Sequence, residues 1–138
     1  MNNMNETFRD RCRSGKINKI RELLDNPDLD PMEQDEYAWN GLDYACSNGH
    51  LEIVKLLLAD DRIDPSETDN FALARAIFGE DNKGFPEIVR LMLDDGRCSI
   101  PAWIGELDHI HLSESVKQVI NEYMYRLDGP IYNQNIIL

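Results

Sequence analysis

Residues 49–58 read Gly49-His50-Leu51-Glu52-Ile53-Val54-Lys55-Leu56-Leu57-Leu58, and this segment decides the fold because the chain repeats it. Residues 15–24 carry the same pattern 34 residues earlier, and residues 84–93 carry it 35 residues later. Self-similarity at such a period is the signature of a stacked repeat protein. Because solenoids usually serve as scaffolds that present a binding surface, the pattern also favours a binding function.

The match extends beyond the glycine segment. Asp30-Pro31 recurs as Asp64-Pro65, and Phe8 corresponds to Leu42. Each unit therefore predicts a short first helix, a turn marked by glycine, a second helix, and a link rich in aspartate and proline. In the last unit, Ser113 is expected to cap the second helix.

The second helices have apolar residues at helical spacing, and the first helices carry small residues where the next unit must approach closely. The apolar positions are Ile17, Ile20, Leu23, Leu24, Leu51, Val54, Leu57 and Leu58, and the small ones are Ala45, Cys46, Ala72 and Ala76. One helix pair has too little core to offset its ordering entropy. Stacked neighbours bury these positions between them, and about three units are needed.

At these residues the chain resembles the ankyrin repeat family. Residues 49–58 reproduce the family's Gly-His-Leu-Glu-Ile-Val-Lys-Leu-Leu-Leu run almost unchanged, whereas its Thr-Pro-Leu-His-x-Ala segment keeps only Leu and Ala, at residues 40–45 and 71–76. The segment from Asp61 to Pro65 departs from the usual repeat ending and is similar to divergent repeats of large DNA viruses and some protists.

The resemblance implies an all-α, ankyrin-like helix-pair solenoid of about four units, with short β-hairpin fingers and a degenerate C-terminal cap. We expect one ankyrin-repeat domain over residues 1–138, because a chain of this length suits a single domain. The expected repeats span residues 5–38, 39–69 and 70–98, followed by a cap at 99–127 and a tail at 128–138. The tail either folds back onto the cap or serves as a short recognition segment.

The chain carries a net charge of −12, and the charge is unevenly distributed. No Lys or Arg occurs from Glu22 to Val54, a window that contains nine Asp and Glu residues. This acidity argues against nucleic-acid binding, because phosphates would be repelled. It favours a basic protein as partner, although acidic loops also serve simply to keep a protein soluble.

In the family that the chain resembles, finger tips and first-helix faces line the groove that grips partners. On that basis the expected partner-binding residues are Glu36, Tyr37, Trp39, Asp43, Ser47, Asn48, Asp69 and Asn70. Trp39 and Tyr37 are candidate anchors, since aromatic residues dominate interface energetics. The structural alternative is that Trp39 only covers the top of the core.

Catalytic and metal-binding patterns find little support in the sequence, and no cofactor is expected. His50 is the helix-start histidine of the family, while His109 and His111 are two residues apart and do not share a helix face. Cys12 and Cys46 occupy equivalent positions and are expected to pack as small hydrophobic residues. Cys98, at the exit of a helix pair, is expected to be partly exposed.

We therefore expect a non-enzymatic protein–protein interaction module, an adaptor or effector that is monomeric alone. Its first residues lack the apolar segment of a signal peptide, and no apolar run approaches the roughly 20 residues of a membrane span, so a cytoplasmic location is expected. For a viral source this would be the host cytoplasm. The alternatives are a virus-type effector that blocks or recruits a basic host protein, a self-associating structural protein that uses the tail, and an enzyme or metal-dependent protein.

Overall fold

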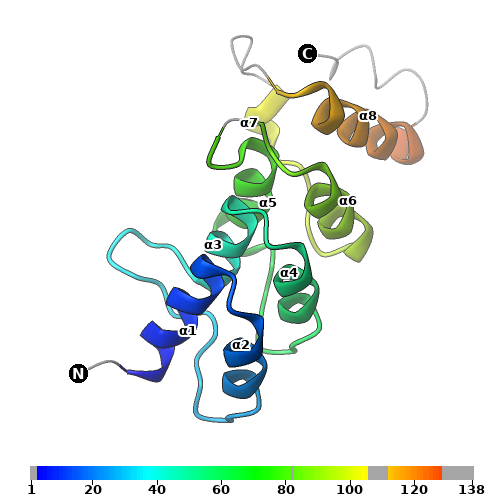
Figure 1. Ribbon diagram of the computed structural model, residues 1–138. Helices are drawn as coiled ribbons and strands as arrows, with labels where there is room; N and C mark the ends of the chain where they lie inside the picture. Colours follow the sequence, from blue (N-terminus) through cyan, green and yellow to red (C-terminus); the bar gives the residue numbers. More distant parts are fainter. Residues whose placement is uncertain (1–2, 82, 106–111, 129–138) are drawn as a thin grey trace.

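The computed structural model describes residues 3–81, 83–105 and 112–128, and in these ranges the regular structure is helical without a strand (Figure 1). The helices are α1 (Met4–Ser14), α2 (Ile17–Leu24), α3 (Gly41–Ser47), α4 (Leu51–Leu58), α5 (Glu67–Phe78), α6 (Pro86–Asp95), α7 (Ala102–Gly105) and α8 (Glu114–Asp128). The expected all-α, ankyrin-like solenoid of helix pairs is thus confirmed.

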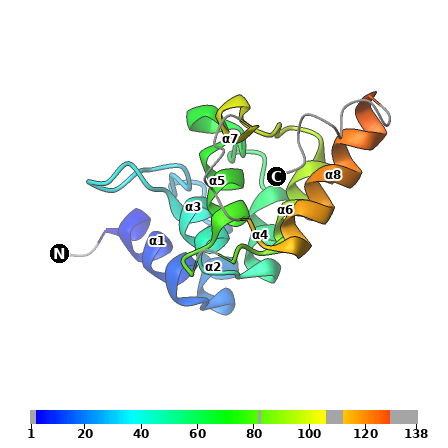
Figure 2. The same ribbon diagram turned by 90° about the horizontal axis from the view of Figure 1, so that it is seen from above.

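The helices form two rows (Figures 1 and 2). The first helices α1, α3 and α5 pack side by side, and the second helices α2, α4, α6 and α8 form the other row. Within each of the first three units the two helices also contact each other. Their apolar faces enclose one core, in which Phe8, Leu57 and Met92 are completely buried. The stacking expected from the apolar spacing is therefore present.

The repeated glycines permit both a tight turn and close stacking. Gly15, Gly49 and Gly84 have φ angles of 80°, 76° and 72°, values that residues other than glycine rarely adopt. A Cβ atom on Gly49 would lie 2.4 Å from the Phe85 ring, and one on Gly15 would lie 2.9 Å from the His50 ring. Each of these two glycines thus lies under the residue that begins the second helix of the following unit.

The first link forms a finger, residues 32–40, but not the expected β-hairpin. The Asp35 carboxylate accepts hydrogen bonds from the backbone N–H groups of Tyr37 (2.9 Å) and Trp39 (3.1 Å). The Asp35 N–H in turn donates to the Trp39 carbonyl at 2.9 Å, and Ala38 adopts a φ of 66°. The loop is closed by these turn bonds around one carboxylate, so no ladder of paired strands forms.

All three cysteines are buried and free. Cys12 and Cys46 lie in the core as expected, whereas Cys98 is only 4 % exposed, so the expected partial exposure is wrong. The Cys98 thiol lies 3.5 Å from the Pro65 carbonyl of the preceding link, which covers it. Burial, reinforced by Asp95, raises the pKa of Cys98 to about 11.

Two arginines join successive units at their links. The guanidinium of Arg62 donates to the carbonyls of Leu24 (2.7 Å), Asn26 (3.0 Å) and Leu29 (3.3 Å) in the preceding unit. Its own orientation is fixed by a two-point contact with Asp60. Arg97, 35 residues later, repeats the arrangement with Asp95 and with carbonyls of residues 58 and 63. Each arginine therefore satisfies carbonyls at a helix end that have no partner within the helix.

The last pair ends the described part of the stack. The Ser113 hydroxyl accepts a hydrogen bond from the Val116 N–H (3.3 Å), which confirms the expected cap of α8. Val116, Val119 and Ile120 are buried against the preceding units. The expected tail beyond residue 128, together with His109 and His111, lies outside the described residues. Among the residues that the structure describes, no helix is long and apolar enough to cross a membrane.

Candidate binding groove

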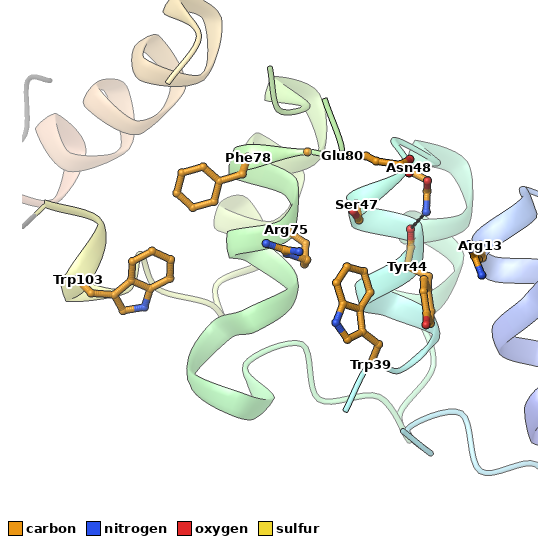
Figure 3. A pocket seen from close by; sticks show the side chains of 10 residues that line it. Arg13, Trp39, Tyr44, Ser47, Asn48, Arg75, Phe78, Glu80 and Trp103 are labelled. Carbon is orange, nitrogen blue, oxygen red and sulfur yellow. Dashed lines mark hydrogen bonds between the residues drawn. The ribbon is translucent and has the colours of Figure 1, made fainter. Parts of the chain in front are cut away.

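A groove of about 620 Å³ runs across the row of first helices (Figure 3). Side chains from α1, α3 and α5 line it, together with the finger, the turn after α5, and α7. The lining residues are Arg13, Trp39, Tyr44, Ser47, Asn48, Arg75, Phe78, Gly79, Glu80 and Trp103. Both tryptophans of the chain, Trp39 and Trp103, are among them. The groove thus draws on all three complete helix pairs.

The repeat register explains why these residues meet. Arg13, Ser47 and Phe78 occupy the same position in α1, α3 and α5, and Tyr44 and Arg75 share another. Equivalent positions in stacked helices point to the same face, so they form two parallel rows across the units. The groove is therefore a property of the stack, because no single unit supplies its walls.

Two aromatic rings lie between two guanidinium groups along the centre of the groove (Figure 3). The Arg13 guanidinium carbon lies 5.7 Å from the Tyr44 ring centroid, and the Tyr44 and Trp39 centroids are 4.9 Å apart. The Arg75 guanidinium carbon lies 5.0 Å from the Trp39 centroid. Cations over aromatic rings at such distances are attracted by the ring quadrupole, so both guanidinium groups are held in place.

Among the described residues, Arg75 is held by stacking on aromatic rings and not by side-chain hydrogen bonds. It is half-buried on α5 and also lies 5.1 Å from the Phe71 centroid. Its Nε atom is buried and has no hydrogen-bond partner in the part of the chain that the structure describes. A buried donor without a partner is uncommon and costs free energy, so it requires an explanation.

The far end of the groove is apolar. The rings of Phe78 and Trp103 stack with centroids 6.0 Å apart and an interplanar angle of 17°. Trp103 remains 38 % exposed although it is a large hydrophobic residue. This end of the groove therefore offers aromatic surface to a ligand.

A second cleft lies beside the groove, between the finger and α1. Its lining includes Glu36 and Tyr37 of the finger, and it shares Arg13 and Tyr44 with the groove. Tyr37 is 71 % exposed. The Tyr44 hydroxyl donates a hydrogen bond to Asp35, and burial together with this bond raises the pKa of Tyr44 to about 12. The phenol thus stays protonated and fixes the base of the finger.

The predicted partner-binding residues divide among these places. Trp39, Ser47 and Asn48 line the groove, and Glu36 and Tyr37 line the adjacent cleft. Sequence reasoning missed Arg13, Tyr44, Arg75, Phe78 and Trp103. The repeat register could have identified Arg13 and Phe78 as equivalents of Ser47, and Tyr44 and Arg75 as equivalents of each other. Trp39 is half-buried and packs on Tyr44.

Asp43 was expected on the binding surface, but it is only 4 % exposed. Its carboxylate accepts a hydrogen bond from the Asn40 N–H, and its own N–H donates to the Asn40 side chain, both at 2.9 Å. This reciprocal pair is a capping box that begins α3. Burial raises the pKa of Asp43 from 3.8 to about 7. The residue therefore serves the helix start and lines neither the groove nor the cleft.

Asp69 and Asn70 lie at the start of α5 and line neither the groove nor the cleft. With Thr68 they form three successive residues with φ between 52° and 61°, in the left-handed region. The Asn70 side chain accepts a hydrogen bond from the Ser99 N–H (3.1 Å) in the following link. Asn70 is thus engaged in joining two units, and only Asp69 is exposed.

The cation-free window of the sequence is not cation-free in space. Arg9 of α1 forms an ion pair with Glu33 at 3.0 Å, and Arg13 and Arg75 lie over the aromatic rings of the window. The hydrogen bond from Arg9 is the main cause that lowers the pKa of Glu33. The neighbouring first helices therefore supply the positive charge that the window itself lacks.

Comparison with known proteins identifies the fold family. The model of ankyrin repeats (3 copies) matches residues 12–102, about two thirds of the chain. The chain therefore belongs to the ankyrin repeat family, whose members are generally non-enzymatic modules for protein–protein interaction. A search of curated proteins finds no match. Among the residues that are described, no three His, Cys, Asp or Glu side chains are placed to hold a metal ion.

Proposed function

We propose that this protein is a non-enzymatic adaptor or effector that binds a partner protein across its row of first helices. The observation that carries the proposal is the groove itself, which spans three stacked units and contains both tryptophans of the chain. Trp and Arg are the residue types most enriched among interface hot spots, and both types lie along this face. The general role of the family supports the same function.

The finger edge, formed by Glu36 and Tyr37, is proposed to make the first contact with a basic surface of the partner. Both residues are exposed, and the chain has a net charge of −12. Opposite charge mainly accelerates association, and salt screens it with a Debye length of about 8 Å at physiological ionic strength. We further propose that the protein acts in the cytoplasm and is a monomer before it binds.

The proposal is tested by isolating partners from cell extract and measuring association and dissociation rates for a purified partner. Glu36→Lys is expected to slow association, and Trp39→Ala is expected to speed dissociation because it removes an anchor. Glu87→Lys is the matched control, since it makes the same charge change at an exposed position in α6, on the other row of helices.

Association that slows with added salt and with Glu36→Lys, but not with Glu87→Lys, is the expected result. Light scattering on the isolated protein addresses self-association. A mass that rises with concentration, with no specific partner recovered, would replace the adaptor function by self-association. If salt, Glu36→Lys and Trp39→Ala all left the association and dissociation rates of a partner unchanged, the binding surface would lie elsewhere.

A further inference from the structure

We infer that the groove holds an extended segment of the partner protein and binds the carboxylate of one Asp or Glu in that segment at the guanidinium of Arg75. Arg13, on the other side of the Tyr44 and Trp39 rings, adds attraction from a longer distance. This inference rests on the proposed function and deepens it, because it states what the centre of the groove recognises. The finger edge and the groove centre then have opposite preferences. The edge attracts basic residues, while the centre accepts one acidic side chain.

The first observation is the pairing of the arginines. In the described part of the chain, Arg9, Arg62, Arg90, Arg97 and Arg126 each form an ion pair with a carboxylate. Arg13 and Arg75 form none within 4.0 Å, and no side-chain hydrogen bond from either guanidinium is present among the described residues. Arg11 and Arg21 also form no ion pair among the described residues, but they lie outside the groove, so both arginines that line the groove keep donors for a ligand.

The second observation is the buried Nε atom of Arg75, for which residues 3–81, 83–105 and 112–128 supply no hydrogen-bond partner. Trp39 and Phe71 lie close to the guanidinium of Arg75, and the Trp39 and Phe71 rings meet edge to face at 5.6 Å. These rings restrict the orientation of the group. An arginine held in this way loses little conformational freedom on binding, and its fork of N–H groups matches the two oxygens of a carboxylate.

The surroundings favour a carboxylate over a phosphate. Glu80 lines the same groove, and the chain as a whole has a charge of −12, so a dianion would meet more repulsion than a monoanion. The stacked Phe78 and Trp103 rings at one end would contact apolar side chains of the same segment. We therefore assign the groove a short peptide motif in which an acidic residue is flanked by apolar ones.

A random linear peptide library displayed on phage, selected on the immobilised full-length protein, tests the inference. Enriched sequences are expected to share an Asp or Glu next to apolar residues. Each enriched peptide is then synthesised with its acidic residue and with the corresponding amide, and binding is followed by intrinsic tryptophan fluorescence, since both tryptophans line the groove. The amide is expected to bind about tenfold more weakly or worse, the usual effect of losing a charge-assisted hydrogen bond.

Variants identify the site. Arg75→Gln is expected to remove most of the difference between acid and amide, and Arg13→Gln a smaller part, because Arg13 acts from a longer distance. Arg75→Lys is expected to keep only part of the difference, because Lys carries the charge but lacks the fork. Arg21→Gln is the matched control, because Arg21 is exposed on α2 and lies outside the groove. Arg13 is exposed, so its substitution leaves the core intact if Arg75→Gln unfolds the protein. Circular dichroism checks the fold of each variant.

The outcomes separate the two proposals. Acid-selective binding that depends mainly on Arg75 supports the inference. Enrichment of basic sequences that depend on Glu36 would overturn the inference and leave the proposed function standing. Enrichment of uncharged sequences, or no enrichment at all, would also overturn it. The proposed function fails separately, if no partner protein binds the first-helix face in the rate measurements.

Discussion

Gly49 illustrates how a single residue sets the spacing between units. Its φ of 76° disfavours any side chain, and the Phe85 ring occupies the space where a Cβ atom would lie. Gly96 also has a positive φ, 91°, but no atom of the described residues lies within 4 Å of the position that its Cβ would take. A comparison of alanine substitutions at Gly49 and Gly96 therefore distinguishes the cost of backbone strain from the cost of a steric clash.

We predict that Gly49→Ala destabilises the protein by about 2–4 kcal/mol, because it combines positive-φ strain of about 1 kcal/mol with overpacking of about 1–3 kcal/mol. Gly96→Ala should cost only the first part, about 1 kcal/mol. Urea unfolding followed by circular dichroism measures both. Equal losses for the two variants would show that the close approach of Phe85 is not a constraint.

Asp43 makes a prediction about pH. Its pKa is raised by burial from 3.8 to about 7, so the folded protein holds a proton that the unfolded chain has released. Stability contributed by this proton is complete below about pH 4 and is lost as the pH rises through about 7, by up to about 1.4 kcal/mol for each pH unit. The pKa values of Asp60 and Asp95 are lowered mainly by hydrogen bonds from Arg62 and Arg97. The stability that these two carboxylates contribute is lost as the pH falls below about 4, so it does not affect the range from pH 4 to 7.

Asp43→Asn is therefore expected to remove most of the loss of stability between pH 4 and pH 7, because an amide oxygen can still accept from the Asn40 N–H without carrying charge. The measurement is urea unfolding at several pH values. Asp61→Asn, at an exposed position in the following link, is the control and should keep the wild-type slope. A slope that survives Asp43→Asn would assign the pH dependence to another group.

At the scale of elements, the links do more than connect helices. The finger is closed by the carboxylate of Asp35, and the later links carry arginines that reach back to the preceding unit. Asp60-Asp61-Arg62 and Asp95-Gly96-Arg97 share an Asp-x-Arg pattern, in which the aspartate orients the arginine two residues later. The Asp-x-Arg pattern is visible in the sequence. The backbone carbonyls that accept from these arginines cannot be identified from the sequence, because every residue has a carbonyl.

We predict that Arg62→Ala destabilises the protein by about 1–3 kcal/mol, since it leaves carbonyls at the end of the preceding unit without their donor. Arg90→Ala is the control, because Arg90 makes an exposed ion pair with Glu122 on a neighbouring helix. Such a pair contributes at most about 1 kcal/mol. Thermal or urea unfolding that gave the two variants equal stability would remove the role of Arg62 in joining units.

At the scale of the whole molecule, the charges that line the groove do not follow the net charge of the chain. The net charge of −12 would attract cations to an average surface, yet two arginines line the groove that holds both tryptophans. At an ionic strength of 0.1 M the Debye length is about 10 Å, so distant carboxylates are largely screened and the nearest guanidinium groups dominate. The local potential at the tryptophans should therefore be positive.

We predict that iodide quenches the tryptophan fluorescence more than caesium does, after each quencher is normalised to its effect on N-acetyltryptophanamide at equal ionic strength. Replacing both arginines, as Arg13→Gln with Arg75→Gln, should reduce or reverse this preference. Arg21→Gln, outside the groove, should leave it unchanged. Stronger quenching by caesium in the wild-type protein would contradict a positive groove and would favour a basic ligand there.

The amino-acid sequence by itself determined the repeat, the helix pairs, the glycine turns and the apolar core. These features depend on periodic spacing and local backbone preferences, which recur along the chain and can be compared from unit to unit. The cap at Ser113 was predictable for the same reason, because a cap is a local hydrogen bond within four residues. The membership of Trp39, Ser47 and Asn48 in the groove followed from their place in the unit.

Only the tertiary structure decided which charges meet. The window from Glu22 to Val54 has no cation of its own, and stacking places Arg9, Arg13 and Arg75 beside it from the units before and after. Asp43 likewise looks like a surface acid in sequence but is buried as a helix cap. Electrostatic interactions depend on distance in space and on burial, and neither follows from distance along the chain.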